Sequence, residues 1–183
     1  RTVHPLLRTR GVPGTHDVGM CDAVLARLPT DTIPMPAVDK GVDDRLPMRS
    51  WPLAGPADIV VLEGWCLGAR PQPDVDLRTP INDLERDEDR DGAWRAYVNA
   101  ALAGRYRRLF ERFDVLIFLA VPDFDAVRRW RADQERELPE RRRMNAPALA
   151  RFISHYERLT RWMLHDLPGR ADLTVELDAE HRI

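Results

Sequence analysis

The stretch that decides the fold is Ala57-Asp58-Ile59-Val60-Val61-Leu62-Glu63-Gly64-Trp65. Its four consecutive apolar residues are mostly β-branched and do not alternate with polar ones. This pattern predicts a strand that is buried on both faces, in the middle of a parallel sheet. Ligands of such sheets bind at the carboxyl ends of the strands, where Glu63 stands, and Gly64 would let the backbone turn sharply there.

The acidic residue at the end of this stretch suggests a metal site. In phosphoryl-transfer folds, a carboxylate that follows a hydrophobic strand helps to hold a magnesium ion and its waters. Glu63 is therefore a candidate residue near a metal. The alternative interpretation is that its carboxylate only leaves the core for solvent.

The composition is that of one globular domain over residues 1–183, with 44% apolar and 32% charged residues. The net charge of −2 gives no reason to expect a nucleic-acid partner. No apolar run approaches the ~20 residues that span a bilayer, and we expect no signal peptide. Cys21 and Cys66 lack metal-ligand spacing and indicate a reducing compartment. We therefore expect a cytoplasmic protein without a membrane partner.

Strands and helices alternate along the rest of the chain. A second buried strand is predicted over 114–120 and an edge strand over 173–178. Apolar residues at helical spacing predict helices, and these cover residues 18–28, 93–113, 124–138 and 147–167. The order predicts an α/β domain with a largely parallel sheet. Three strands make a thin sheet, and the chain opens with Arg1 in a polar segment, so we expect more strands upstream.

A glycine-rich loop, Arg10-Gly11-Val12-Pro13-Gly14-Thr15-His16-Asp17, comes before the first helix, and Thr15 or Asp17 is the expected helix cap. Such a loop can bind an anion through its backbone N–H groups. It is not the phosphate loop GxxxxGK[ST], because Lys40 is the only lysine of the chain. A structural turn and a substrate loop both remain open for it.

Two further segments concentrate charge. Asp39-Lys40-Gly41-Val42-Asp43-Asp44-Arg45 is either a polar site or a solvated loop. Arg128, Arg129 and Arg131 follow a strand and a short turn, as in nucleotide kinases whose arginine-rich helix covers the transferred phosphate. The alternative is an exposed helix with intrahelical pairs, such as Arg129 with Asp133 and Arg131 with Glu135.

The glycine-rich loop, the 39–45 cluster and Val61-Leu62-Glu63-Gly64-Trp65 together resemble the plant and bacterial D-glycerate 3-kinase family. Asn82-Asp83-Leu84-Glu85 and Trp130-Arg131-Ala132-Asp133-Gln134-Glu135 are similar to that family too, in the same order. The resemblance implies a three-layer P-loop NTPase-like fold, related to phosphoribulokinase and uridine kinase, with a parallel sheet flanked by helices. It also implies transfer of the γ-phosphoryl group of ATP, with magnesium, to a hydroxyl of D-glycerate or a similar small acid.

The resemblance assigns roles to individual residues. It implies catalytic roles for Glu63, Arg128 and Arg131, with Glu63 near the metal, and contact of Arg129 with the nucleotide. The residues that it implies for substrate binding are Arg10, His16, Asp17, Lys40, Asp44 and Arg45.

The sequence departs from the family pattern at its start, because the family's phosphate loop precedes the glycine-rich loop and is absent here. We therefore expect an incomplete form that is inactive alone, with its N-terminal strands missing. Two alternatives are a related P-loop kinase for a nucleoside or pantothenate-like alcohol, and a non-catalytic binding module without a P-loop.

Overall fold

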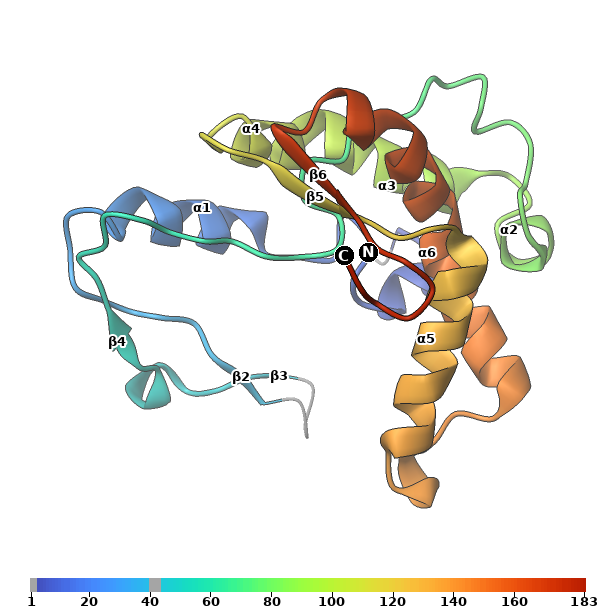
Figure 1. The fold of residues 1–183 in the computed structure, drawn as a ribbon, viewed down its shortest axis with the longest axis horizontal. Helices are drawn as coiled ribbons and strands as arrows, with labels where there is room; N and C mark the ends of the chain where they lie inside the picture. The colour runs from blue at the N-terminus through green and yellow to red at the C-terminus, as the bar shows by residue number, and fades with distance from the viewer. Residues whose placement is uncertain (1–2, 40–43) are drawn as a thin grey trace. The chain divides into compact units, whose positions relative to one another are not determined.

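The computed structural model describes residues 3–39 and 44–183. The chain divides into two compact units. The larger unit comprises Arg1–His16 and Trp65–Ile183, and the smaller unit comprises Asp17–Gly64. Figure 1 gives the labels of the elements.

The described residues of the smaller unit form one α-helix, the short helix η2 (Met48–Ser50) and two short antiparallel strand pairs. Asp17 caps the helix, because its side chain accepts a hydrogen bond from Met20 N–H, as expected from the sequence. The elements are α1 (Val18–Arg27), β1 (Ile33–Pro34), β2 (Val38–Asp39), β3 (Asp44–Arg45) and β4 (Leu53–Ala54), with β1 paired to β4 and β2 to β3. The prolines that are dense between 29 and 56 limit each strand to two residues.

The prediction of a buried strand at residues 57–63 was wrong for the structure described. Ala57 donates to the carbonyl of Leu28, but no backbone hydrogen bond joins residues 58–64 to any other described segment. Ile59 and Val61 are 83% and 85% exposed. A strand becomes buried only when neighbouring strands and covering helices remove it from water, and the described part of the smaller unit supplies neither.

The larger unit is mainly helical. Its longer helices are α3 (Ala93–Ala101), α5 (Phe124–Glu137) and α6 (Ala146–Asp166). The shorter helices are η1 (Pro5–Arg8), α2 (Asp83–Glu88), α4 (Arg107–Phe110), η4 (Glu140–Arg142) and η5 (Leu167–Gly169). Three predicted helices, over 18–28, 124–138 and 147–167, are confirmed to within one residue at each end. The predicted helix over 93–113 is confirmed in place, but a π-helical turn, Leu102–Tyr106, separates α3 from α4.

The sheet of the larger unit has two parallel strands, β5 (Ile117–Ala120) and β6 (Leu173–Glu176), which lie side by side in Figure 1. Ile117 pairs with Leu173 and Ala120 with Glu176. The predicted burial of β5 on both faces was wrong, because Ile117 and Leu119 are exposed. The described residues thus form a mixed α/β fold with small sheets, and the expected three-layer parallel sheet is not formed by them.

The core of the larger unit brings the N-terminal residues against helices that follow much later in the chain. Leu6 and Val12 pack with Leu84 of α2 and Trp94 of α3. Each such side chain contributes roughly 1.5–3 kcal/mol when fully buried. This packing anchors the segment from Leu6 to Val12, and with it the first part of the glycine-rich loop.

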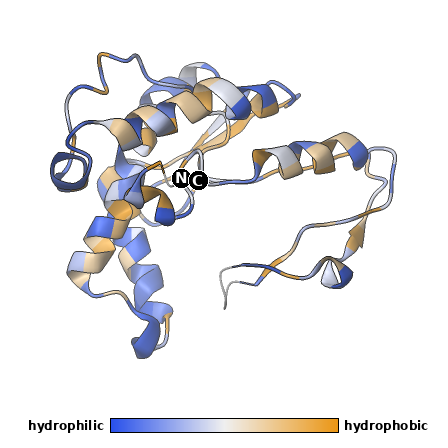
Figure 2. Cartoon of the chain, turned by 180° about the vertical axis from the view of Figure 1, so that it is seen from behind, coloured by the Kyte–Doolittle hydropathy of each residue, from blue (hydrophilic) through white to orange (hydrophobic). Residues whose placement is uncertain are grey.

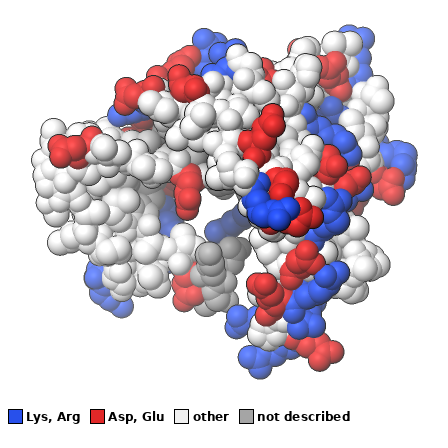
Figure 3. Space-filling model, viewed as in Figure 1, with Lys and Arg blue, Asp and Glu red and all other residues white. Residues whose placement is uncertain are grey.

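Helix α5 packs beside α6 (Figure 1) and is capped by Asp123, as predicted, through a hydrogen bond from Ala126 N–H. Figure 2 shows that the end of α5 and the turn after it are hydrophilic. In Figure 3, positive and negative side chains are interleaved over the same region. No helix among the described residues is both long and apolar enough to cross a membrane.

Candidate functional site

The glycine-rich loop is built as a closed turn by its own threonine. The Thr15 hydroxyl accepts a hydrogen bond from Gly11 N–H at 3.0 Å and donates to the carbonyl of Val12 at 2.7 Å. Val12 and Pro13 are buried, so the middle of the loop is anchored in the core. The loop is therefore held by hydrogen bonds within itself and by the burial of its middle residues.

Two glycines let the loop pass close to aromatic rings. Gly11 and Gly14 have φ angles of 115° and 98°, which a side chain rarely tolerates. A Cβ atom at Gly11 would lie 2.8 Å from the hydroxyl oxygen of Tyr156, and one at Gly14 would lie 2.5 Å from Cε1 of Tyr97. Only glycine fits at these two positions.

Two tyrosine hydroxyls hold the ends of the loop. Tyr156 donates to the carbonyl of Arg10 at 2.7 Å. Tyr106 accepts from Gly14 N–H at 2.9 Å, and its oxygen lies 2.7 Å from Nδ1 of His16. The predicted substrate residues Arg10 and His16 are thus presented from the two fixed ends of one loop. Both side chains are exposed enough to meet a ligand.

The ring of His16 is covered on its Nδ1 side by Tyr106 and accessible elsewhere. Burial lowers the pKa of His16 below its ordinary value of 6.5, because the imidazolium form loses solvation. The site therefore holds a neutral imidazole at neutral pH, which can donate one hydrogen bond and accept another.

Sequence reasoning missed Tyr106, which lies within the predicted helix over 93–113. One signal was available: a buried tyrosine hydroxyl needs a hydrogen-bond partner. The π-helical turn that ends at Tyr106 is a second feature common at functional sites, but it is visible only in the structure.

The three candidate lid arginines of α5 have different surroundings. Arg128 pairs with Asp125 at 3.4 Å and with Glu157 of α6 at 3.3 Å. Arg131 pairs with Glu135 at 3.0 Å, as the alternative interpretation expected. Arg129 is exposed and has no ion pair with a described residue, so the expected pair with Asp133 is not formed.

Arg128 borders a cavity of about 520 Å³ between the N-terminus of α2, the start of α5 and the first half of α6. Its polar lining includes Asn82, Asp83, Ser154 and Glu157. Its apolar lining consists of Ile81, Ala146, Leu149, Ala150 and Ile153. A cavity of this size suits a small molecule or part of a nucleotide.

Glu157 is the buried member of this cavity, with 3% of its surface exposed. It accepts hydrogen bonds from Arg128, Arg161 and Asn82. Asn82 also caps α2 and donates to the carbonyl of Ser154. These contacts give the Asn82-Asp83-Leu84-Glu85 motif a structural task, since it fastens α2 to α6 beside the cavity.

The remaining predicted residues lie in the smaller unit, apart from Lys40, which lies outside the described residues. Arg45 pairs with Asp17 at 3.1 Å, and the Asp44 carboxylate accepts from Arg45 N–H at 2.7 Å. This contact brings three of the predicted substrate residues together. Glu63 is exposed. No three His, Cys, Asp or Glu side chains within 3–39 and 44–183 converge on a metal position.

Comparison with known proteins identifies the relatives of this chain. The uncharacterized kinase mug58 of Schizosaccharomyces pombe is 30% identical over 164 residues, which are 84% of this chain and 58% of that protein. The D-glycerate 3-kinase of Arabidopsis thaliana chloroplasts is 28% identical over 140 residues, which are 71% of this chain and 28% of that protein. These matches make the chain similar to kinases, including a D-glycerate 3-kinase, and support a D-glycerate 3-kinase-like relationship.

Other findings agree with this relationship. The probable ATP-dependent kinase TDA10 of Saccharomyces cerevisiae is 28% identical over 97% of this chain and 66% of that protein. The solved D-glycerate 3-kinase of Cryptococcus neoformans has the same fold, with a TM-score of 0.71 over 99% of this chain and 69% of that chain, at 22% identity. No protein-family model matches.

The chain spans less than two thirds of the length of the D-glycerate 3-kinase-like proteins that it matches by sequence, with 58%, 66% and 28% of them covered. The sequence relatives are two yeast proteins and a plant protein. All three relatives are named as kinases, one of them as ATP-dependent and one for D-glycerate.

Proposed function

We propose that this chain supplies the acceptor-binding loop and the arginine helix of an ATP-dependent kinase for D-glycerate or a similar small hydroxy acid. The observation that carries the proposal is the loop from Arg10 to His16, clamped by Tyr106 and Tyr156, in a chain related to kinases named for D-glycerate. A preformed loop positions a small acceptor at low entropic cost, and positioning is the main task in phosphoryl transfer.

The acceptor's carboxylate would be bound by cationic and donor groups at this loop. Arg10 supplies a guanidinium, which suits bidentate contact with a carboxylate, and His16 supplies a neutral ring with one N–H. Asp17, Lys40, Asp44 and Arg45 are proposed as further substrate-binding residues, carried by the smaller unit. The ion pair between Arg45 and Asp17 supports a shared role for the two residues.

The arginines of α5 would neutralise the charge of the transferred phosphoryl group. Arg128 and Arg131 are proposed for this catalytic role, and Arg128 is supported by its place at the cavity of about 520 Å³. Arg129 is proposed to contact the nucleotide, because its guanidinium makes no ion pair with a described residue.

The proposed cofactors are ATP and magnesium, and the carboxylate of Glu63 fits the magnesium ion. A protein usually holds Mg²⁺ with only one or two carboxylates, and phosphates and waters complete the octahedron. The exposed carboxylate of Glu63 suffices for that role, so a cluster of three ligating side chains is not required. Bound magnesium would neutralise charge on the ATP phosphates. No GxxxxGK[ST] segment occurs in the sequence, so the contacts proposed here are to the metal and the outer phosphates.

The test is an acceptor panel with the protein as its gene encodes it. ADP formation from ATP and magnesium would be followed with D-glycerate, L-glycerate, uridine and pantothenate. We expect D-glycerate to give the highest kcat/KM. Turnover with uridine or pantothenate and none with D-glycerate would replace the proposed substrate class, and no turnover with any acceptor would favour a binding module. Fractionation of cells tests the expected cytoplasmic location.

A further inference from the structure

The hydroxyl of Tyr106 has three hydrogen-bonding partners in the glycine-rich loop. Gly14 N–H lies 2.9 Å from its oxygen, His16 N–H lies 3.4 Å away, and Nδ1 of the His16 ring lies 2.7 Å away. No other partner of this hydroxyl is found in the described part of the chain. A phenol has one proton and two acceptor lone pairs, so these partners use its full capacity.

This arrangement determines where the proton of His16 lies. The two backbone N–H groups can only donate, so they occupy both lone pairs of the Tyr106 oxygen. The hydroxyl proton then has one acceptor left, which is Nδ1 of His16. If Nδ1 carried a proton, three N–H groups would point at one oxygen and the hydroxyl proton would have no acceptor. Nδ1 is therefore the unprotonated nitrogen, and the neutral ring carries its proton on Nε2.

Tyr106 is itself held firmly enough to impose this choice. It is 4% exposed, and its ring packs edge-on against Phe110 and against the ring of His16, with centroids 5.9 Å apart in each case. Burial raises the pKa of the Tyr106 phenol, which keeps its proton at neutral pH. The donor that reaches Nδ1 is therefore always present.

We propose that Tyr106 is a positioning residue that fixes His16 in the Nε2–H tautomer, so that the loop offers a neutral donor to an anionic oxygen of the acceptor. The ligand class, a small carboxylate, rests on the proposed function. The tautomer does not, since it follows from the contacts inside the loop. Fixing the donor in advance removes an ordering step from acceptor binding.

The experiment is nitrogen NMR of the chain with ¹⁵N-labelled histidine, at pH 7.5. Two-bond proton–nitrogen correlations distinguish the Nε2–H tautomer, the Nδ1–H tautomer and the charged ring. The signal of His16 is identified by its loss in His16→Gln, which leaves the signals of the four other histidines. We expect His16 to be present as the Nε2–H tautomer. A predominantly Nδ1–H or charged ring in the wild type would overturn the proposal.

Two phenylalanine variants distinguish the loss of the hydrogen bond between Tyr106 and His16 from a general loosening of the loop. Tyr106→Phe removes the donor to Nδ1, and we expect a mixture of tautomers. Tyr156→Phe removes a hydroxyl that holds the same loop at Arg10, and we expect the tautomer of His16 to be unchanged. The positioning role of Tyr106 would be contradicted if His16 kept the Nε2–H tautomer in Tyr106→Phe. It would also be contradicted if the population of this tautomer fell equally in both variants. The wild-type spectrum decides the tautomer even if Tyr106→Phe fails to fold.

Kinetics then test the link to the acceptor. In a protein that turns over D-glycerate, Tyr106→Phe should raise the KM for glycerate about 10-fold, with a smaller change in kcat, as expected when a hydrogen bond to a charged group is weakened. An Nε2–H tautomer with an unchanged KM would refute the role in acceptor binding. Absence of turnover with glycerate in the wild type would refute the proposed function while leaving the tautomer established by NMR.

Discussion

The guanidinium of Arg158 donates hydrogen bonds to both carboxylate oxygens of Glu85, from Nε to Oε1 at 2.7 Å and from Nη2 to Oε2 at 2.6 Å. This pair joins α6 to α2. Arg158 also donates to the carbonyls of Asp76 and Thr79. The carboxylate is fully buried, so the remaining charge would be left without compensation if either partner were removed.

Breaking this pair should therefore destabilise the fold. We expect Glu85→Gln to lower the free energy of unfolding by about 3–5 kcal/mol, because it leaves a nearly buried guanidinium unpaired. Urea titration followed by circular dichroism measures the change. Glu88→Gln, on the same helix, is the matched control, since its pair with Arg151 is solvent-exposed and should contribute no more than ~1 kcal/mol. Equal losses in the two variants would refute this account.

Gly14 should not tolerate a side chain. Gly14→Ala forces a Cβ into the ring of Tyr97 at a φ of 98°, and we expect it to cost about 1–3 kcal/mol of stability. Gly104→Ala is the comparison, because a Cβ there meets nothing within 4 Å and alanine favours a helix by up to ~1 kcal/mol. Thermal unfolding of both variants gives the answer. A Gly14→Ala protein as stable as the wild type would show that the loop is not rigid.

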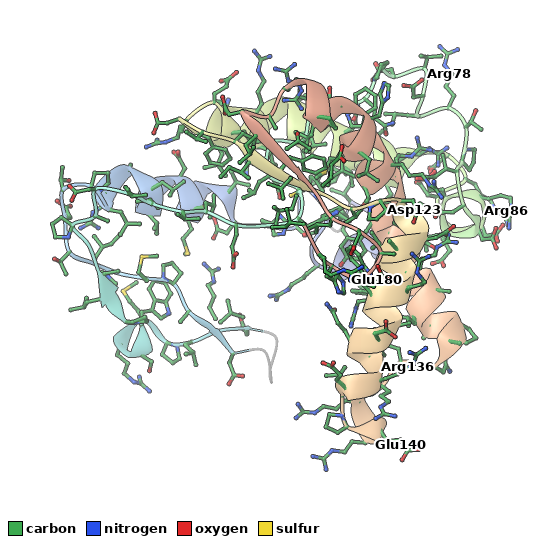
Figure 4. All side chains as sticks on the ribbon, in the orientation of Figure 1. Arg78, Arg86, Asp123, Arg136, Glu140 and Glu180 are labelled. Carbon is green, nitrogen blue, oxygen red and sulfur yellow. The ribbon has the colours of Figure 1, made fainter. Side chains whose placement is uncertain are left out.

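Arg128 should matter for turnover more than Arg136, an arginine of α5 that the proposed function does not involve. We expect Arg128→Ala to reduce kcat on the order of 10²-fold, as when a charge-stabilising donor is lost, while Glu157 keeps its pair with Arg161. Arg136→Ala is the control. Arg136 lies at the opposite end of α5 from Asp123 (Figure 4) and pairs only with Asp133 among described residues. Equal kcat values for the two variants would remove Arg128 from the catalytic role.

Glu63→Gln should lower kcat more than it raises the KM for glycerate, because the proposed carboxylate acts on the metal rather than on the acceptor. The loss should persist at saturating magnesium. Asp58→Asn changes an exposed carboxylate at the other end of the same apolar run and should leave kcat unchanged. Steady-state kinetics with varied magnesium measure both variants. Wild-type turnover of Glu63→Gln at saturating magnesium would contradict the role.

His155 should make the fold sensitive to mild acid. Burial lowers the pKa of His155, which is 2% exposed; its carbonyl contacts and the charges of Arg151 and Glu88 have smaller effects. A histidine whose pKa is lower in the folded state contributes stability above the unfolded pKa of about 6.5, and this is lost as the pH falls. Between pH 7.5 and 5.5 the wild type should therefore lose more stability than His155→Gln.

Urea titrations at the two pH values measure this difference. His165→Gln, which changes an exposed histidine of the same helix, should behave like the wild type. Equal pH dependence of the wild type and His155→Gln would show that the buried ring does not titrate in this range.

The sequence predicts the helices well and the sheet poorly, for a physical reason. Helix α5 is specified by contacts between residues three and four apart and by the Asp123 cap, and its predicted end is wrong by one residue. The apolar run of 57–63 has the composition of a strand, but a strand is stable only with partners, which local sequence does not specify. Composition alone therefore predicted a strand where the described structure has none.

The candidate site was likewise predictable only where local sequence specifies it, and not where it depends on contacts between distant segments. The glycine-rich loop and the arginines of α5 are recognisable as short motifs. Tyr106 is 90 residues from His16 in the chain, and its contact depends on how α3 and the following turn pack against the N-terminal segment. Whether Glu63 and the arginines act on one substrate stays a prediction.

The bare hydrophobic segment from Ile59 to Leu62 also has a practical consequence for anyone purifying the chain. Four consecutive water-facing aliphatic side chains, with high β propensity and no proline, have the character of segments that stack between molecules into fibrils. Asp58 and Glu63 act as electrostatic gatekeepers at its two ends. Neutralising both charges at once should speed thioflavin-positive aggregation of concentrated stocks.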